Sequence, residues 1–164
     1  MTAEGEPLGS GRAAADAARR GIPVEIVEQP PARSLEEAAA ALGITPADIV
    51  KSLVVKRADG TFLLALVPGD RQISWPKLRA LVGVNRLQLP DAAVALEATG
   101  YERGTITPFG SRTAWPVYLD ERAAGRRISM GAGERGRSLW VDADELARGF
   151  AAVVADLSEP LAAR

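Results

Sequence analysis

The sequence predicts a single domain of the α/β (mixed α+β) class, in which helices surround a mixed, mostly antiparallel sheet. Its 164 residues correspond to one domain, since domains average about 150 residues. Hydrophobic residues make up 47% of the chain and charged residues 25%, as in ordinary soluble globular proteins. Helix-like and strand-like segments alternate, and an Asp59-Gly60 hairpin signal between two strands argues against a purely parallel sheet.

Capping residues and glycines mark the predicted helices. Ser34-Leu-Glu-Glu37 is a capping box, in which the serine accepts a hydrogen bond from a backbone N–H and the glutamate reaches back. Pro46 stands in the first position of the next short helix, which is expected to run into Lys51. Residues 1–12 are expected to form a flexible N-terminus to a domain over residues 13–164. The predicted helices span 13–20, 34–43, 45–51, 74–82, 90–98 and 142–157.

Short strands are predicted between these helices. Asp59-Gly60 joins the second strand to the third as a hairpin, and Gly-rich loops separate the later strands. The predicted strands span 24–27, 52–55, 62–67, 115–119, 127–130 and 138–141.

The chain contains no cysteine and no histidine. The missing cysteines exclude thiol nucleophiles, disulfides and thiolate metal sites, and they fit a reducing compartment. The missing histidines exclude Ser-His and Cys-His catalysis and imidazole metal sites. Chemistry is therefore restricted to carboxylates, Lys, Arg, hydroxyls, backbone amides, water and groups of the substrate. The acidic start has no apolar run behind it and no segment approaches a membrane span of roughly 18 apolar residues, so a cytoplasmic protein without membrane contact is expected.

The net charge of −1 hides an asymmetry along the chain. Residues 51–140 hold 14 basic and 8 acidic side chains, a net charge of +6 between two acidic ends. A polyanionic partner would meet this charge if it folds onto one face, and scattered solvated charge is the alternative. The arginines considered for phosphate contacts are Arg112, Arg126, Arg127, Arg135 and Arg137.

Gly131-Ala-Gly133-Glu-Arg-Gly136 matches the G-x-G-x-x-G pattern of dinucleotide-binding folds. That pattern must open a helix, whereas residues 138–141 look like a strand and only 28 residues follow Gly136. Two other interpretations are a tight connection between strands and a loop whose amides bind an anion or an oxyanion.

Two further features draw attention. Lys51 stands among Ile49, Val50, Leu53 and Val54, in a chain with three lysines and 17 arginines. A lysine there is either a point charge that serves a site or a residue at a sheet edge whose ammonium reaches solvent. Residues 100–110 hold glycines and a proline in a rigid loop that would let a ligand approach the backbone, or form a plain turn.

Together these segments resemble the YbaK/EbsC family of aminoacyl-tRNA deacylases, which is related to the editing domain of bacterial prolyl-tRNA synthetases. The resemblance covers about residues 20–158 and is carried by the order and spacing of four motifs. These are Ile49-Val-Lys51-Ser-Leu-Val-Val55, Leu66-Val-Pro-Gly-Asp70, Gly100-Tyr with Gly104-x-x-x-Pro108-Phe-Gly110, and Gly131-Ala-Gly133.

The resemblance implies a single mixed α/β domain that hydrolyses the ester between a wrong amino acid and the terminal adenosine of a tRNA. The implied catalytic residues are Lys51, Gly131, Ala132 and Gly133, with Lys51 holding the adenosine or the aminoacyl group. The implied substrate-binding residues are Gly104, Thr105, Ile106, Thr107, Pro108, Phe109 and Gly110. The implied partners are an aminoacyl-tRNA, such as a mischarged tRNAPro, and an aminoacyl-tRNA synthetase; no metal or cofactor is implied.

An activated ester suits a chain without histidine or cysteine, because positioning of water and oxyanion stabilisation supply much of the acceleration. Cysteinyl-type members of the family have a tyrosine where this chain has Glu28-Gln29, a serine where it has Gly131, and an acid near Ser138. A different small amino acid (Ala, Ser, Thr or 2-aminobutyrate) is therefore the expected substrate. The alternatives are a non-catalytic module of the same fold that binds tRNA or a synthetase, and a nucleotide-dependent enzyme that uses Gly131–Gly136.

Overall fold

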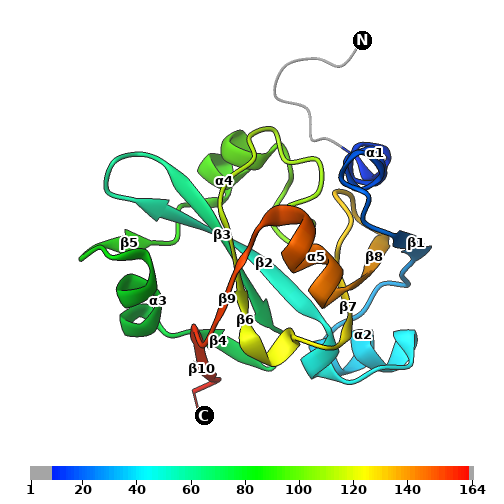
Figure 1. The fold of residues 1–164 in the computed structure, drawn as a ribbon. Coiled ribbons are helices and arrows are strands. Elements are labelled where there is room, and N and C mark those ends of the chain that lie inside the picture. Colours follow the sequence, from blue (N-terminus) through cyan, green and yellow to red (C-terminus); the bar gives the residue numbers. More distant parts are fainter. Residues whose placement is uncertain (1–8, 163–164) are drawn as a thin grey trace.

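The computed structural model describes residues 9–162 of the chain, in which helices and strands are interleaved (Figure 1). The helices are α1 (Ser10–Arg20), α2 (Leu35–Leu42), α3 (Trp75–Val82), α4 (Ala92–Thr99) and α5 (Ala143–Phe150), with 3-10 turns at Pro46–Asp48 and Glu121–Ala123. The strands are β1 (Val24–Glu28), β2 (Val50–Arg57), β3 (Phe62–Pro68), β4 (Arg71–Ile73), β5 (Leu87–Gln88), β6 (Val117–Asp120), β7 (Arg127–Gly131), β8 (Arg137–Asp142), β9 (Val153–Ala155) and β10 (Ser158–Pro160). No helix in this part of the chain is long and apolar enough to cross a membrane.

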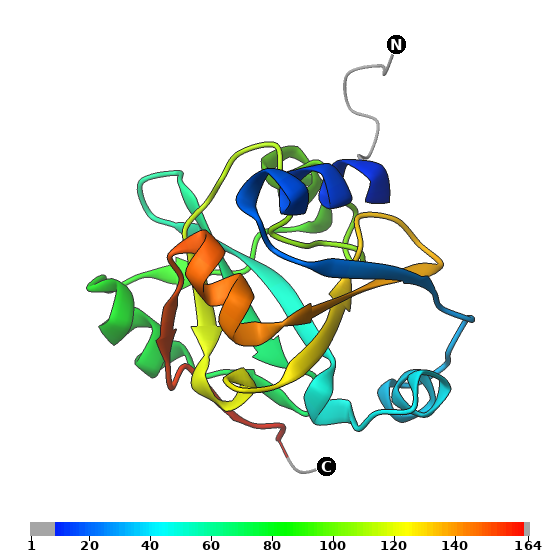
Figure 2. The same ribbon diagram turned by 45° about the vertical axis from the view of Figure 1, so that its right-hand side comes forward.

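The strands form three sheets of unequal size. The largest has the order β5-β2-β3-β6-β9, and its β3–β6 and β6–β9 pairings are parallel. A second sheet, β1-β8-β7, and a two-stranded sheet, β10-β4, are antiparallel. The predicted mixed, mostly antiparallel α/β architecture is thus confirmed. Figure 2 shows α1 above β1 and α2 set apart beyond the end of β1.

Strand β2 has one open edge, and this edge positions the site described below. On one side β2 pairs with β3 along its whole length, whereas on the other side β5 pairs only with Lys56 and Arg57. The Gly69 N–H donates to the Ile49 carbonyl at 2.6 Å and the Arg57 N–H donates to the Thr61 carbonyl at 2.8 Å. Because antiparallel hydrogen-bonded pairs alternate, the backbone polar groups of Ser52 and Val54 face the open edge.

Two hydrophobic clusters lie on the two faces of the β2–β3 hairpin. Val54, Leu64 and Leu66 belong to the larger cluster, which extends to β7, β8 and α5. Val55, Leu63 and Ala65 belong to the smaller one, beneath α3. Burial on both faces explains why β3 has an uninterrupted apolar sequence.

The C-terminal helix is shorter than predicted. The sequence predicts a helix to residue 157, but α5 ends at Phe150, Ala151 adopts a left-handed conformation with φ 50°, and β9 follows. Val153 and Val154 are β-branched and lie beside the free side of β6, with which β9 pairs in parallel. Tertiary pairing therefore overrides the helical pattern of residues 151–157.

Several boundaries also differ from the prediction. The short helix before Lys51 is a 3-10 turn that ends at Asp48, because β2 begins at Val50, so Lys51 is a strand residue. Strands β4, β5, β9 and β10 are not predicted from the sequence; each has two or three residues. Of the N-terminus predicted to be flexible, residues 1–8 lie outside the described residues, and Ser10–Arg12 belong to α1.

Candidate functional site

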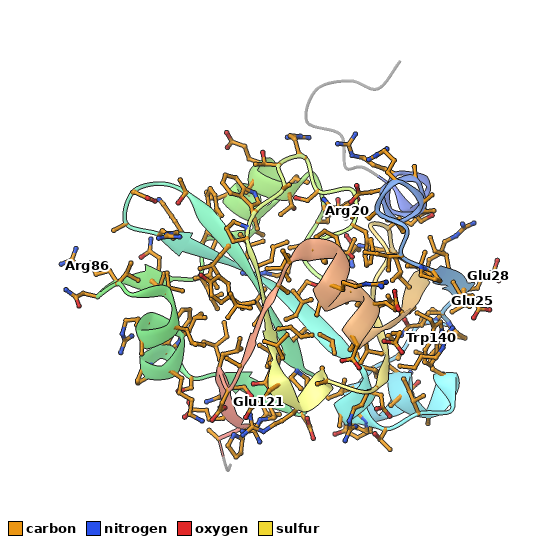
Figure 3. The ribbon with its side chains drawn as sticks, viewed as in Figure 1. Arg20, Glu25, Glu28, Arg86, Glu121 and Trp140 are labelled. Atoms are coloured by element: carbon orange, nitrogen blue, oxygen red, sulfur yellow. The ribbon has the colours of Figure 1, made fainter. Side chains whose placement is uncertain are left out.

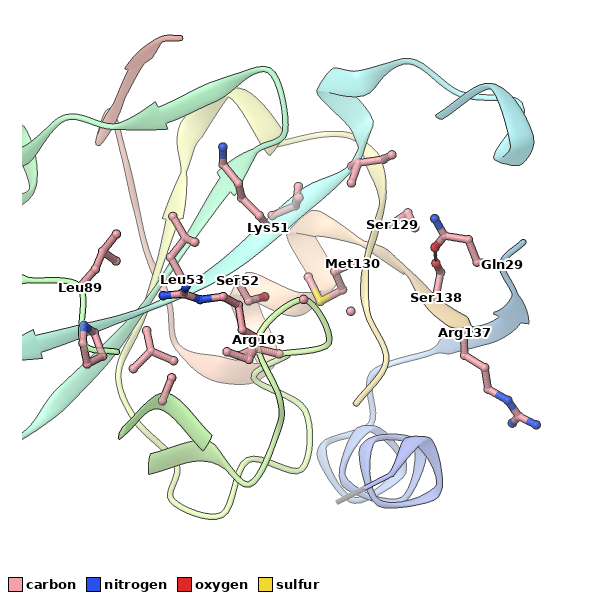
Figure 4. A pocket seen from close by; sticks show the side chains of 18 residues that line it. Gln29, Lys51, Ser52, Leu53, Leu89, Arg103, Ser129, Met130, Arg137 and Ser138 are labelled. Atoms are coloured by element: carbon pink, nitrogen blue, oxygen red, sulfur yellow. Dashed lines mark hydrogen bonds between the residues drawn. The ribbon is translucent and has the colours of Figure 1, made fainter. Parts of the chain in front are cut away.

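A cavity of about 580 Å³ opens at the free edge of β2 (Figure 4). One wall is β2 itself, from Val50 to Val54. The opposite walls are the loop from Arg103 to Ile106 and the end of β7, where Ser129 and Gly131 lie. The volume is in the range of small-molecule sites, and two walls come from strands, which hold side chains more rigidly than loops do.

Lys51, the second residue of β2, lines the cavity. Its side chain is partly buried, and no described residue forms an ion pair or hydrogen bond with its ammonium. Burial lowers the pKa of Lys51, and the carboxylate of Asp70 opposes this shift. In Figure 4 the side chain extends away from β2 and its ammonium ends clear of the other labelled side chains. This cation is therefore available to a ligand.

The two glycine-containing loops of the predicted site lie against each other. The Gly133 N–H donates to the Thr105 carbonyl at 2.9 Å. A Cβ atom on Gly131 would lie 2.6 Å from the Ile106 carbonyl oxygen and 2.7 Å from that of Thr105. Gly131 is thus required by close backbone approach.

The predicted site residues divide into two groups. Lys51, Gly104, Ile106 and Gly131 line the cavity. The others do not line it; they are Thr105, Thr107, Pro108, Phe109, Gly110, Ala132 and Gly133. Thr107, Phe109 and Ala132 are fully buried.

The residues behind the cavity hold its wall in place. The Thr107 hydroxyl donates to the Met130 sulfur at 3.4 Å, and the Tyr101 hydroxyl donates to the Phe109 carbonyl at 2.6 Å. Burial raises the pKa of Tyr101 to about 12, so this donor keeps its proton. The Gly110 N–H donates to the Asp16 carboxylate at 2.8 Å, which ties the loop to α1. These contacts make the loop a rigid support.

Sequence reasoning did not identify some of the residues that line the cavity as site residues. Arg103 lines the cavity (Figure 4), and the structure gives its guanidinium no partner among the described residues. Ser52 has a buried hydroxyl with no hydrogen-bond partner among the residues that the structure describes. Gln29 and Ser138 hydrogen-bond to each other across the β1–β8 pair. Arg103 lies inside the loop of residues 100–110, which its glycines had marked as a candidate site. Nothing in the sequence marked Ser52 as a site residue.

Of the five arginines predicted for phosphate contacts, Arg137 lines the cavity and the others do not. Arg126 pairs with Asp48 at 2.9 Å, and Arg127 pairs with Glu25 at 3.0 Å. Arg135 lies 3.4 Å from Glu102, and Arg112 donates to the Glu97 carbonyl at 3.3 Å.

The G-x-G-x-x-G segment is the hairpin loop between β7 and β8. No helix follows it before α5, because β8 begins at Arg137. A dinucleotide fold requires a helix there, so the nucleotide-dependent alternative loses its structural basis. The interpretation as a tight connection between strands fits the structure.

Comparisons with known proteins relate this chain to aminoacyl-tRNA editing domains. Residues 29–148 match the family model described as an aminoacyl-tRNA editing domain. A proline–tRNA ligase of Thermosipho africanus is 42% identical over 88 residues, which are 54% of this chain and 16% of the ligase. The proline–tRNA ligase of Heliobacterium modesticaldum is 34% identical over 119 residues, 72% of this chain and 20% of the ligase. The chain therefore spans a fifth or less of these curated relatives.

Two crystal structures match over almost their whole length. A protein proposed to be a trans-editing enzyme for prolyl tRNA synthetase has a TM-score of 0.84 and 31% identity, over 97% of this chain and 99% of that chain. A hypothetical protein has a TM-score of 0.83 and 29% identity, over 90% of this chain and 99% of that chain.

Proposed function

This chain belongs to the aminoacyl-tRNA editing domain family, and we propose that it is a hydrolase that removes a small wrong amino acid from a tRNA. The observation that carries the proposal is the cavity at the open edge of β2, where Lys51, Gly104, Ile106 and Gly131 meet. Its 580 Å³ suits an aminoacyl group joined to a nucleoside. A mischarged tRNAPro is the first substrate to test.

In the proposed reaction a water oxygen attacks the ester carbonyl carbon, and the bond from that carbon to the ribose oxygen breaks. The ribose oxygen takes up a proton, and the neighbouring ribose hydroxyl passes protons between the water and the leaving oxygen. The protein supplies position and charge, which account for much of the acceleration of an activated ester.

We assign separate roles to the cavity walls. The Lys51 ammonium holds the terminal adenosine or the aminoacyl group, since it has no ion pair among the described residues. The free N–H groups of Ser52 and Val54 face the cavity and offer hydrogen bonds to the ester. The Gly104–Ile106 backbone limits the space for the amino-acid side chain. A pocket of this kind separates near-isosteric side chains by about 1–3 kcal/mol.

The test is a deacylation panel. tRNAPro charged in turn with Ala, Cys, Ser, Thr and 2-aminobutyrate, and correctly charged with Pro, is incubated with wild type and with Lys51→Met. We expect selective hydrolysis of a mischarged species by wild type and a loss of kcat/KM of about 100-fold in the variant, the size found for removal of one preorganised donor.

Lys77→Met is the matched control. Lys77 pairs with Asp156 at 2.9 Å and lines neither wall of the cavity. It should hydrolyse the same species at the wild-type rate. Full activity of Lys51→Met would remove Lys51 from the site.

A non-catalytic binding module is the second candidate. Gln29 and Ser138 satisfy each other by a hydrogen bond, and Gly131 carries no side chain, so these positions offer no free reactive group. Binding of tRNA without hydrolysis of any mischarged species would establish this function instead.

A further inference from the structure

A second cavity, of about 440 Å³, lies at the other end of β2. Its cationic lining residues are Lys56, Arg57, Arg79 and Arg86, and no acidic residue lines it. Figure 3 shows Arg86 at the end of the molecule opposite Glu25 and Glu28. None of the roles assigned so far uses this cavity.

The cations of this cavity have no protein partner among the described residues. Among the described residues, eight Lys or Arg side chains form ion pairs and four others donate a hydrogen bond only to a neutral group. Seven have neither kind of contact within the described part of the chain: Arg33, Lys51, Lys56, Arg57, Arg79, Arg86 and Arg103. All of these except Arg33 line one of the two cavities.

This distribution points to an anionic ligand. Cations that repel one another without a counter-charge reduce the stability of the folded chain. Arginine forks match phosphate oxygens in geometry and charge, and they lose less hydration on contact than lysine does. The second cavity is therefore suited to phosphate groups.

The two cavities are joined by two elements. Strand β2 passes from Lys51 in the first cavity to Lys56 in the second, which spans about 17 Å at 3.4 Å per residue. The chain after β5 passes from Gln88 in the second cavity to Leu89 and Pro90 in the first. A stacked nucleic-acid strand has one phosphate per about 3.4 Å, so this path corresponds to about five nucleotides.

We propose that the second cavity binds backbone phosphates of the RNA strand whose 3′ end occupies the first cavity. The proposal rests on the proposed function, because it takes the ligand of the first cavity to be the end of a tRNA. It adds a binding site away from the reacting ester. The cavity holds the tRNA in register and contributes affinity that does not depend on base sequence.

Binding of fluorescein-labelled, unacylated tRNAPro tests the proposal, measured by anisotropy over a series of KCl concentrations. The double variant Arg57→Gln/Arg86→Gln should raise Kd about 10-fold at moderate salt. The slope of log Kd against log salt should fall by about 1.4, since each lost contact to a single strand contributes about 0.7. Arg33→Gln/Arg148→Gln removes the same charge from outside both cavities and should leave Kd within about twofold of wild type.

A shorter RNA locates the contact. The trinucleotide CCA does not reach the second cavity, so wild type and the Arg57→Gln/Arg86→Gln variant should bind it equally. The proposal would be overturned if both double variants lost the same amount of tRNA affinity. It would also be overturned if neither variant lost any. So would tight binding of inorganic phosphate alone in this cavity, seen by calorimetry with wild type and absent in the variant, because the ligand would then be a free anion.

The outcome is separable from that of the deacylation panel. Unacylated tRNA binding requires no hydrolysis, so a chain that hydrolyses nothing can still show the predicted salt dependence. A chain that deacylates a mischarged tRNA while the Arg57→Gln/Arg86→Gln variant binds tRNA like wild type would overturn this inference and leave the proposed function standing.

Discussion

Gly131 shows how one missing side chain shapes the cavity wall. The backbone carbonyls of Thr105 and Ile106 occupy the space that a Cβ atom would need, at 2.7 and 2.6 Å. Neither carbonyl is at the end of a flexible side chain, so a larger residue must displace the loop itself. The position of the cavity wall therefore depends on this glycine.

Gly131→Ala should lower the free energy of unfolding by about 1–3 kcal/mol, as overpacking of a close-packed site does. It should also reduce the rate of deacylation by more than the loss of stability explains, because the cavity wall formed by the loop that contains Thr105 and Ile106 is displaced. Urea denaturation and the deacylation assay measure the two effects. Gly11→Ala is the control: a Cβ there meets nothing within 4 Å and the residue lies in α1, so stability should stay equal or rise.

The pH dependence of hydrolysis follows from Lys51. Burial lowers its pKa below the ordinary 10.5, so the ammonium is lost as pH rises through a value under 10.5. We expect the enzymatic rate, corrected for spontaneous ester hydrolysis, to fall as the pH becomes alkaline. The fall should begin at a lower pH than the titration of a free lysine would give. No inflection of the enzyme should appear near 6.5, the value of imidazole, because the chain contains no histidine.

Lys51→Arg is the control for this profile. An arginine stays charged throughout the accessible pH range, so any activity of the variant should lack the fall at alkaline pH. An identical fall in both proteins would assign the titration to the substrate.

Sequence reasoning identified those site residues whose residue type is unusual for their place in the sequence. Lys51 was conspicuous as a lysine within an apolar stretch, at the predicted junction of a helix and a strand, and Gly104 and Gly131 as glycines in irregular loops. Gln29 was noted only as a departure from the family pattern and Ser52 only as part of a motif, and both line the cavity because of the pairing of β1 and of β2. That pairing is a tertiary property.

At the scale of elements, helix α1 supports the site without touching the cavity. Asp16 accepts hydrogen bonds from the Gly110 N–H, from Arg20 and from Arg19. Burial alone would raise the pKa of Asp16, but these hydrogen bonds together lower it below 3.8. The stability that this carboxylate contributes is therefore fully present above the pKa that Asp16 has in the unfolded chain. It is lost as the pH falls through the lower pKa that Asp16 has in the folded protein.

Asp16→Asn should lower the free energy of unfolding by about 1–3 kcal/mol at pH 7, the effect of losing a charged hydrogen-bond acceptor. The difference from wild type should begin to shrink as pH falls below 3.8, the ordinary pKa, and disappear once pH is below the lowered pKa of the folded carboxylate. Urea denaturation at several pH values measures it. Asp91→Asn, at the N-cap of α4, should have little effect because asparagine caps equally well.

The helices with both a cap and a glycine stop were predictable, as α2 and α3 illustrate with Ser34 and Ser74 at one end and Gly43 and Gly83 at the other. Helix α5 has its N-cap at Asp142 but ends at Phe150 with Ala151 as its C-cap, so no glycine marks the end. The short strand β9 that follows exists because β6 has a free side. Local sequence does not contain that information.

At the scale of the whole molecule, the sequence predicted an excess of positive charge in residues 51–140 but not its arrangement. Folding pairs some of those cations with acids from elsewhere, as in Arg126 with Asp48 and Arg127 with Glu25. Among the described residues of this segment, the cations with neither an ion pair nor a hydrogen bond all line the two cavities. The tRNA-binding experiment above tests this arrangement directly.

The open edge of β2 also bears on self-association. A strand with unpaired backbone groups is a template for a strand of another molecule, and such edges promote aggregation. Here the loop around Gly104 and the segment at Pro90 line a cavity along this edge, and Lys51 places a charge on the strand. A concave edge of this kind offers less room to a second extended chain than to a small ligand, so we expect it not to promote aggregation.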